Sequence, residues 1–256
     1  MIQIDKNRLA RFMAEAKLAR GQGKGVNGKI DLCINQAVDW ITGGAGLTDA
    51  PACVDPVIRR FCIVLNDADR FAPFRDELKP FAARIANTNA GEEVSIQRGF
   101  ICADWSIRTV APKAFEFWAA SVPAKRDEAL AWAEKLRAVP VIVDKASALA
   151  GREVALSAQE AAMDAAYAPY AAAAVADAGA DAAEYAAAAA DAYAVEYAGA
   201  VADAAAYAGA YAYADAYADA AAAAAARPKA KAFARELWEM SLAHLDRMIR
   251  VTEVAA

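Results

Sequence analysis

Six carboxylates are the side chains whose type could support catalysis or metal binding. Asp and Glu can transfer protons to a substrate, or bind a metal ion, when several of them share one site. No spacing sets these six apart from the acids that solvated helix surfaces routinely carry, so a carboxylate or metal enzyme is the weakest of three functional hypotheses. The six are Asp67, Asp69, Glu92, Glu93, Asp104 and Glu116.

The cysteines and the single histidine form no metal-binding pattern. The cysteines lack Cys-x-x-Cys spacing and lie in apolar helical patterns, so we predict buried free thiols in a reducing cytoplasm. His244 lies on the apolar face of a C-terminal helix and is predicted to be a core histidine with a satisfied hydrogen bond. We therefore predict no catalytic residue, no metal site and no cofactor. The cysteines are Cys33, Cys53, Cys62 and Cys102.

A glycine-rich loop with one lysine, residues 21–28, has the composition of some phosphate-binding loops. It lacks the Gly-x4-Gly-Lys-Ser/Thr spacing, and no strand is predicted before it, so the backbone amides that cradle a phosphate would not be arranged. We predict a flexible linker instead.

Tyrosines recur in an alanine-rich segment, residues 165–226, in which 38 of 62 residues are alanine. A spacing of four places many of them in pairs on one helix face. The rings could cover the edges of an alanine-packed core, or they could form a binding surface, since Tyr is enriched at interfaces. The residues predicted to bind a partner are Tyr193, Tyr197, Tyr207, Tyr211, Tyr213, Tyr217, Asp215 and Asp219.

The charge of the chain is uneven. Residues 151–226 hold one basic residue against eleven acids, a local charge of −10, whereas the whole chain carries −5. These acids could simply keep an alanine surface hydrated, or they could attract a basic protein partner. Nothing in the overall charge suggests direct binding to nucleic acid.

The alanine-rich segment is predicted to be helical because alanine is the best helix former. Ser157 and Glu160 have the spacing of a capping box, and Pro228 would end the helix at Arg227. A single helix of this length would span about 93 Å, against a radius of gyration of about 18 Å for a compact chain of this size. We expect two or three helices folded back on each other; one long helix is the alternative.

The rest of the chain carries start signals for further helices. Asp5, Asn27 and the pair Asp55-Pro56 are predicted helix caps, and residues 92–110 form a strong helical pattern in which Asp104 can pair with Arg108. Residues 139–143 are the only strand-like run. Because that run is isolated, we interpret it as an extended connection and assign the chain to the all-α class.

The last predicted helix, residues 229–251, carries two adjoining apolar stripes and must dock on something. We predict an N-terminal multi-helix domain, residues 1–150, packed with an alanine-rich helical half, residues 151–256, whose helices are antiparallel and close. No run of about 20 uncharged apolar residues could span a membrane, and the N-terminus has no apolar signal region. These features predict a cytoplasmic protein without membrane contact.

Several short motifs resemble those of uncharacterised alanine-rich helical proteins of bacteria and phages. The resemblance covers residues 50–226, including their alanine tracts, and implies no activity that can be transferred. Its motifs are Cys53-Val-Asp-Pro-Val, Asn66-Asp67, Leu78, Pro80, Arg84, Thr88, Ala103-Asp104-Trp105, Arg108-Thr109 and Pro112.

The sequence favours a non-catalytic protein–protein interaction protein. It would act as an adaptor, an inhibitor or an assembly component, including one encoded by a phage, through its acidic Tyr/Ala-rich helical surface. The alternative is a self-assembling structural oligomer, in which alanine helices of different chains pack together. An enzyme with a carboxylate or metal site is the second alternative.

Overall fold

The computed structural model describes residues 2–121, 123–163 and 220–252, and most of these residues are helical, which confirms the all-α class. The short 3-10 turns are η1 (Asp69–Phe71), η2 (Arg75–Phe81) and η4 (Pro123–Lys125), and η3 (Ser106–Val110) is a π-helical turn. The α-helices are α1 (Lys6–Glu15), α2 (Ile34–Ile41), α3 (Pro56–Asp67), α4 (Ala82–Ile85), α5 (Glu92–Trp105), α6 (Ala111–Ser121), α7 (Arg126–Arg137), α8 (Lys145–Met163) and α11 (Ala220–Ile249).

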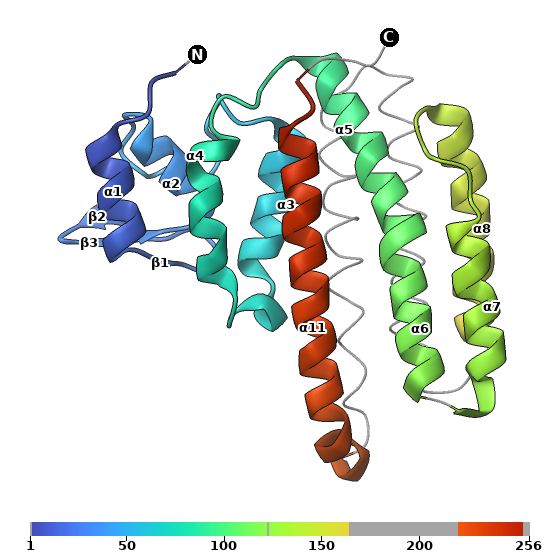
Figure 1. The fold of residues 1–256 in the computed structure, drawn as a ribbon. Coiled ribbons are helices and arrows are strands. Elements are labelled where there is room, and N and C mark those ends of the chain that lie inside the picture. The colour runs from blue at the N-terminus through green and yellow to red at the C-terminus, as the bar shows by residue number, and fades with distance from the viewer. Residues whose placement is uncertain (1, 122, 164–219, 253–256) are drawn as a thin grey trace.

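The helices are arranged side by side in an order that differs from the chain order (Figure 1). The C-terminal helix α11 lies between α3 and the continuous rod made by α5, η3 and α6. Helices α7 and α8 follow at one end, and α1, α2 and a small sheet lie at the other. The last helix of the chain therefore packs in the middle of the molecule, beside α3 and α5.

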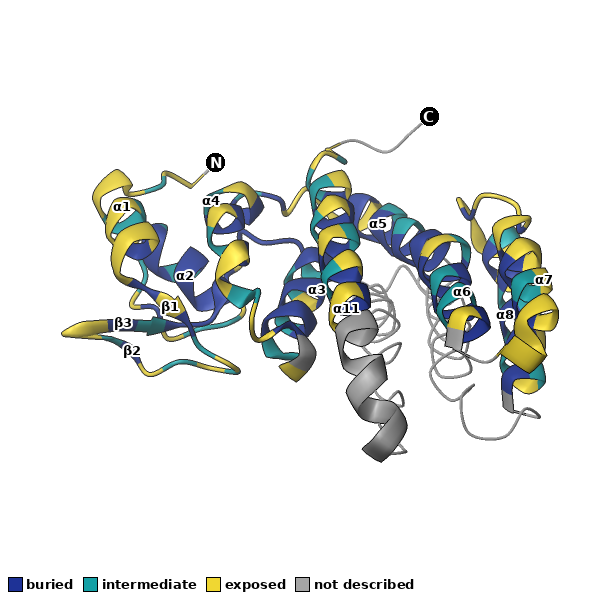
Figure 2. Cartoon of the chain, turned by 60° about the horizontal axis from the view of Figure 1, so that its bottom comes forward, coloured by how far each residue is buried: buried dark blue, intermediate teal, exposed yellow. Residues whose placement is uncertain are grey.

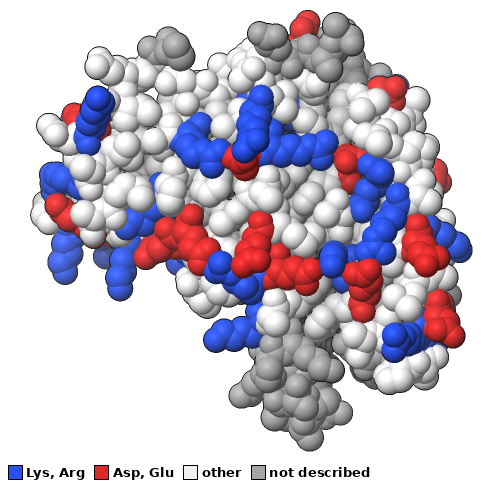
Figure 3. All heavy atoms as spheres, viewed as in Figure 1, with Lys and Arg blue, Asp and Glu red and all other residues white. Residues whose placement is uncertain are grey.

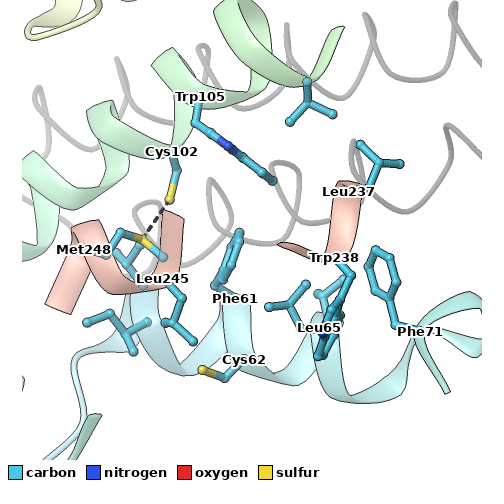
Figure 4. Close-up of a cluster of buried hydrophobic side chains, with 14 of the residues drawn as sticks. Phe61, Cys62, Leu65, Phe71, Cys102, Trp105, Leu237, Trp238, Leu245 and Met248 are labelled. Carbon is cyan, nitrogen blue, oxygen red and sulfur yellow. Dashed lines mark hydrogen bonds between the residues drawn. The ribbon is translucent and has the colours of Figure 1, made fainter. Parts of the chain in front are cut away.

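One continuous hydrophobic core runs from α1 to α11. Where α11 enters it, Leu237, Trp238, Leu245 and Met248 have no exposed surface (Figure 4). This confirms that the apolar face of the closing helix docks. Burying one such side chain stabilises the fold by about 1.5–3 kcal/mol, so α11 is an integral part of the core.

Two predicted helix starts are confirmed. The Asp5 carboxylate accepts hydrogen bonds from the amides of Asn7 and Arg8 at the start of α1. At the start of α3, Asp55 accepts from the amides of Val57 and Ile58, and Pro56 occupies the first helical turn. Each cap satisfies backbone donors that a helix cannot pair internally.

The loop predicted to be a flexible linker contains part of a small sheet, so that prediction was wrong. The strands β1 (Lys17–Leu18), β2 (Gly25–Asn27) and β3 (Lys29–Leu32) pair in the order β1-β3-β2, with β1 parallel and β2 antiparallel to β3. Gln36 fixes the loop, because its side chain bonds both the N–H and the C=O of Gly23, at 2.7 and 3.2 Å. Figure 2 shows the hairpin projecting from the body of the molecule.

Three predicted helix boundaries were also wrong. Cys33, not Asn27, caps α2 in a capping box with Gln36. Helix α8 begins at Lys145 after Asp144, whose carboxylate accepts from the Ser147 amide at 2.8 Å, so Ser157 lies inside the helix. Helix α11 begins at Ala220 and continues through Pro228.

The extended connection is confirmed, since residues 139–143 form no strand. The proposed division of the chain at residue 150 falls inside α8. The question of one long or several shorter helices in the alanine-rich segment concerns residues that the structure does not describe, apart from residues 220–226 at the start of α11.

Candidate interaction surfaces

The residues predicted to bind a partner lie outside the described residues, in the interval 164–219. The structure therefore does not test them, and they stay a prediction. They are Tyr193, Tyr197, Tyr207, Tyr211, Tyr213, Tyr217, Asp215 and Asp219.

Four of the six carboxylates considered for catalysis have separate structural partners. Asp67 accepts from the Gly21 amide at 2.7 Å, and Asp69 pairs with Arg20 at 2.8 Å. Asp104 pairs with Arg108 at 2.9 Å, a pairing that the sequence predicted, and Glu116 pairs with Lys113 at 3.5 Å. Glu92 and Glu93 lie in the first turn of α5, where a negative charge favours the helix dipole.

Asp104 is the most buried of these acids, with 5% of its surface exposed. Besides Arg108, its carboxylate accepts from the Ile142 amide at 3.1 Å and lies 3.9 Å from Arg247 of α11. It thus joins three segments of the fold. Within the described ranges, no three His, Cys, Asp or Glu residues are grouped so that they could hold a metal ion.

The four cysteines are free and buried, as predicted. Burial raises the pKa of the thiols of Cys33, Cys62 and Cys102, so they stay protonated. A protonated thiol is a poor nucleophile. These cysteines therefore fill the core, and the Cys102 Sγ lies 3.3 Å from the Met248 Sδ.

His244 is buried as predicted, but the prediction of a satisfied hydrogen bond was wrong. Neither ring nitrogen has a hydrogen-bond partner in the described part of the chain. The ring stacks on Trp105, with centroids 4.5 Å apart, and tilts against Phe61 at 5.3 Å. Burial, with a smaller contribution from Arg247, lowers the pKa of His244 to about 3, so the imidazole is neutral and packs as an aromatic ring.

A buried ion pair joins the middle of α5 to the start of α3 and the end of α11. Arg98 of α5 and Asp55, the cap of α3, lie 2.7 Å apart with at most 1% of either side chain exposed. Arg98 also donates to the carbonyls of Thr88, Met248 and Val251 at 2.8, 3.1 and 2.5 Å. The last two carbonyls lie in the last turn of α11 and just beyond it, where a helix leaves carbonyls without an i+4 partner.

Charged side chains cross the face that contains α11 in two rows of mixed sign (Figure 3). Arg235 binds Glu77 at 2.5 Å, and Lys113 binds Glu236 at 2.8 Å, so that α11 is joined to η2 on one side and to α6 on the other. The hydrogen bond to Glu236 raises the pKa of Lys113. Because these four charges pair with one another, they offer little net charge to a ligand.

In the part of the chain that the structure describes, the outer face of the small sheet carries unpaired positive charges, unlike the paired charges on the face that contains α11. It borders an open hollow of about 1000 Å³ lined by residues 15, 17, 24, 25 and 27–31. Lys17, Lys24 and Lys29 are exposed there, and their ammonium groups have no ion-pair or hydrogen-bond partner among the described residues. Figure 3 shows basic side chains projecting at this end of the molecule.

No role was predicted from the sequence for the three lysines of the small sheet or for Arg98. A signal for the lysines was present, because residues 1–31 hold seven basic residues and three acids, a local charge of +4. A second signal was the alternation of Lys29-Ile30-Asp31-Leu32, which is typical of a half-buried strand. No local signal marks Arg98, because its partners lie up to 153 residues away.

Comparisons with known proteins identify no relative. No protein-family model, no curated protein and no solved structure matches the chain. None of the helices in the described residues is long and apolar enough to cross a membrane.

Proposed function

We propose that this chain is a non-catalytic protein–protein interaction protein, an adaptor, inhibitor or assembly component whose acidic Tyr/Ala-rich segment contacts the partner. The observation that carries the proposal is the composition of residues 151–226, where one basic residue stands against eleven acids among recurring tyrosines. Tyr supplies contact area with little conformational entropy to lose, and clustered acids attract a basic partner over a distance.

The described helices support the proposal through the roles of their own charged groups. Asp55 caps α3, and Asp104 joins α5 to α11 and to the extended connection. Side chains committed to internal bonds are poor candidates for a reaction centre. The acidic segment holds eleven acids against one basic residue, an imbalance that a basic partner would neutralise.

The compartment proposed for this function is the reducing cytoplasm. All four cysteines are free, and each is buried. Disulfides form and persist in oxidising compartments, so four unpaired cysteines fit a reducing one.

The experiment is a quantitative pull-down from a lysate of the source organism or its host, with nuclease present, comparing three baits. The wild-type bait is compared with a variant carrying Tyr211, Tyr213 and Tyr217→Ala and with a control carrying Tyr167, Tyr170 and Tyr185→Ala. We expect one stoichiometric protein that is lost from the first variant and kept by the control. Equal recovery by all three baits would contradict the proposal.

A self-assembling oligomer is the second candidate, and the alanine content of residues 165–226 favours it. Alanine faces allow helix axes to approach to about 8 Å, in one chain or between chains. Mass measured by light scattering over a concentration series separates the two arrangements, because only assembly between chains raises the mass with concentration.

A further inference from the structure

We propose that the outer face of the β1-β3-β2 sheet is a second interaction surface, which binds an acidic protein segment. This surface, the basic sheet face, consists of Lys17, Lys24 and Lys29 around the open hollow. It lies in the N-terminal part of the chain, so the proposal does not depend on the acidic Tyr/Ala-rich segment.

The pairing register places Lys17, Asp31 and Lys29 on one face, and Lys24, which directly precedes β2, lines the same hollow. Lys17 is opposite Asp31, Asp31 is opposite Gly25, and Lys29 is opposite Asn27. Side chains alternate between the two faces of a strand, so Ile30 and Leu32 point the other way and are buried in the core. The sheet thus has one apolar face that holds it to the body and one polar face that is open.

The charges of this face are available to a ligand. Arg98 and the paired cations of the α11 face are already neutralised, whereas the three lysines have no anionic partner in the described structure. Of the two acids that line the hollow, Glu15 is bound by Arg11 at 3.2 Å. Three ammonium groups without an anionic partner thus line the same hollow as one carboxylate, Asp31, that has no ion pair among the described residues.

Asp31 favours an acidic protein segment over nucleic acid. It lies on the central strand, between the strands that carry Lys17 and Gly25. Duplex DNA carries one negative charge per about 1.7 Å, so a phosphate would be forced close to this carboxylate. A protein segment carries its acids several residues apart and can place them beside the lysines, leaving Asp31 opposite neutral residues.

The residues that line the hollow also favour an acidic protein segment over nucleic acid. None of its residues is aromatic, so it offers no ring on which a base could stack. Asn27 and the backbone around Gly28 provide hydrogen-bonding groups of the kind that a peptide backbone can use. The ligand class that fits both observations is a peptide segment with spaced Asp or Glu residues.

The test is fluorescence anisotropy with a labelled peptide that alternates Glu and Ser, its counterpart with Gln in place of Glu, and a labelled DNA duplex. The variant carries Lys17, Lys24 and Lys29→Gln. The control carries Lys125, Arg126 and Lys231→Gln, which removes the same charge from exposed positions elsewhere. Circular dichroism confirms that each protein is folded.

We expect the wild type and the control to bind the Glu peptide, the variant to bind it about tenfold more weakly, and the Gln peptide to bind to none of them. The proposal is overturned if the Glu peptide does not bind, if the control loses as much affinity as the variant, or if the duplex binds to these lysines more tightly than the peptide. If the peptide does not bind, the function proposed for the acidic Tyr/Ala-rich segment still stands, because the pull-down tests different residues.

Discussion

At the residue scale, two buried polar side chains have opposite effects on stability. Arg98 pairs with the Asp55 carboxylate and donates hydrogen bonds to the carbonyls of three other residues. Neither ring nitrogen of His244 has a hydrogen-bond partner within the described structure, and the ring remains buried only because it is neutral. A buried polar group is tolerated when it is bonded or uncharged, and it destabilises the fold otherwise.

His244 should make the protein sensitive to mild acid. Its pKa is about 3 in the folded state and about 6.5 in an unfolded chain, so below pH 6.5 only the unfolded state takes up the proton. Stability is therefore full above pH 6.5 and falls as the pH drops, by about 2 kcal/mol at pH 5 from this residue alone. Urea unfolding at pH 8 and pH 5 measures the change.

The carboxylates also contribute to that pH dependence, so a His244→Phe variant serves as the reference. Phenylalanine can still stack on Trp105 but cannot titrate. The variant should be at least as stable as the wild type at pH 8, and it should lose about 2 kcal/mol less between pH 8 and pH 5. An identical pH dependence in both proteins would show that His244 is not the group responsible.

Removing Arg98 should be among the most damaging single changes. Arg98→Met leaves the Asp55 carboxylate buried without its cation and the end of α11 without its donors, at a cost of about 3–5 kcal/mol. Arg84→Met is the matched control, because the Arg84–Asp246 pair is partly exposed and such pairs contribute about 1 kcal/mol or less. Urea midpoints that fall equally in the two variants would refute this assignment.

At the scale of elements, helix starts were predictable where a single residue supplies the cap. Asp55 followed by Pro56 indicated the start of α3 from the sequence alone, and the Asp104–Arg108 pair followed from their spacing. The start of α2 was missed because Ile30 fits both the helical repeat of Ile34 and the alternation of a strand. A cysteine cap at Cys33 is unusual enough that no residue preference indicates it.

The small sheet was missed for a tertiary reason. Its strands are two to four residues long, and the loop at residues 21–28, which contains β2, reads as flexible because of its glycines. What orders that loop is Gln36, whose side chain meets Gly23 only once α2 has formed. The basic sheet face was missed with it, since three lysines become one surface only after the strands pair.

Gly23 should be the most sensitive position of this sheet. A Cβ added there would lie 2.1 Å from the Asp31 carbonyl oxygen, so Gly23→Ala must displace backbone, and we expect a cost of about 2–3 kcal/mol. Gly28→Ala is the control, since a Cβ there meets nothing within 4 Å and adds only the strain of a positive φ, about 1 kcal/mol.

The measurement for both glycine variants is urea unfolding together with affinity for the Glu peptide. The peptide should bind more weakly to Gly23→Ala than to Gly28→Ala, because displaced strands separate the lysines. Equal costs at the two glycines would mean that the loop adapts without effect on the sheet.

At the scale of the whole molecule, α11 packs into the core formed by helices that lie far before it in the sequence. The proposed boundary at residue 150 rests on a change in composition, whereas packing continues across it through α8 and returns through α11. Composition indicates where the chain changes character, but it carries no information on which distant helix fills the core.

A chain that ends at residue 219 should therefore lose its cooperative fold. Without α11, the core lacks Leu237, Trp238, Leu245 and Met248, each fully buried, and Arg98 lacks two of its acceptors. We expect retained helical far-UV signal, a broad thermal transition and binding of a hydrophobic dye. A sharp transition close to that of the full chain would show that residues 1–163 fold without α11.

The bond between Arg98 and the Val251 carbonyl has a consequence for synthesis on the ribosome. The two residues are 153 positions apart, which at typical elongation rates corresponds to roughly 10–30 s of translation. During that interval Phe61 and Trp105 lack the His244 ring that they contact in the folded protein. The growing polypeptide therefore offers apolar surface to chaperones until α11 emerges.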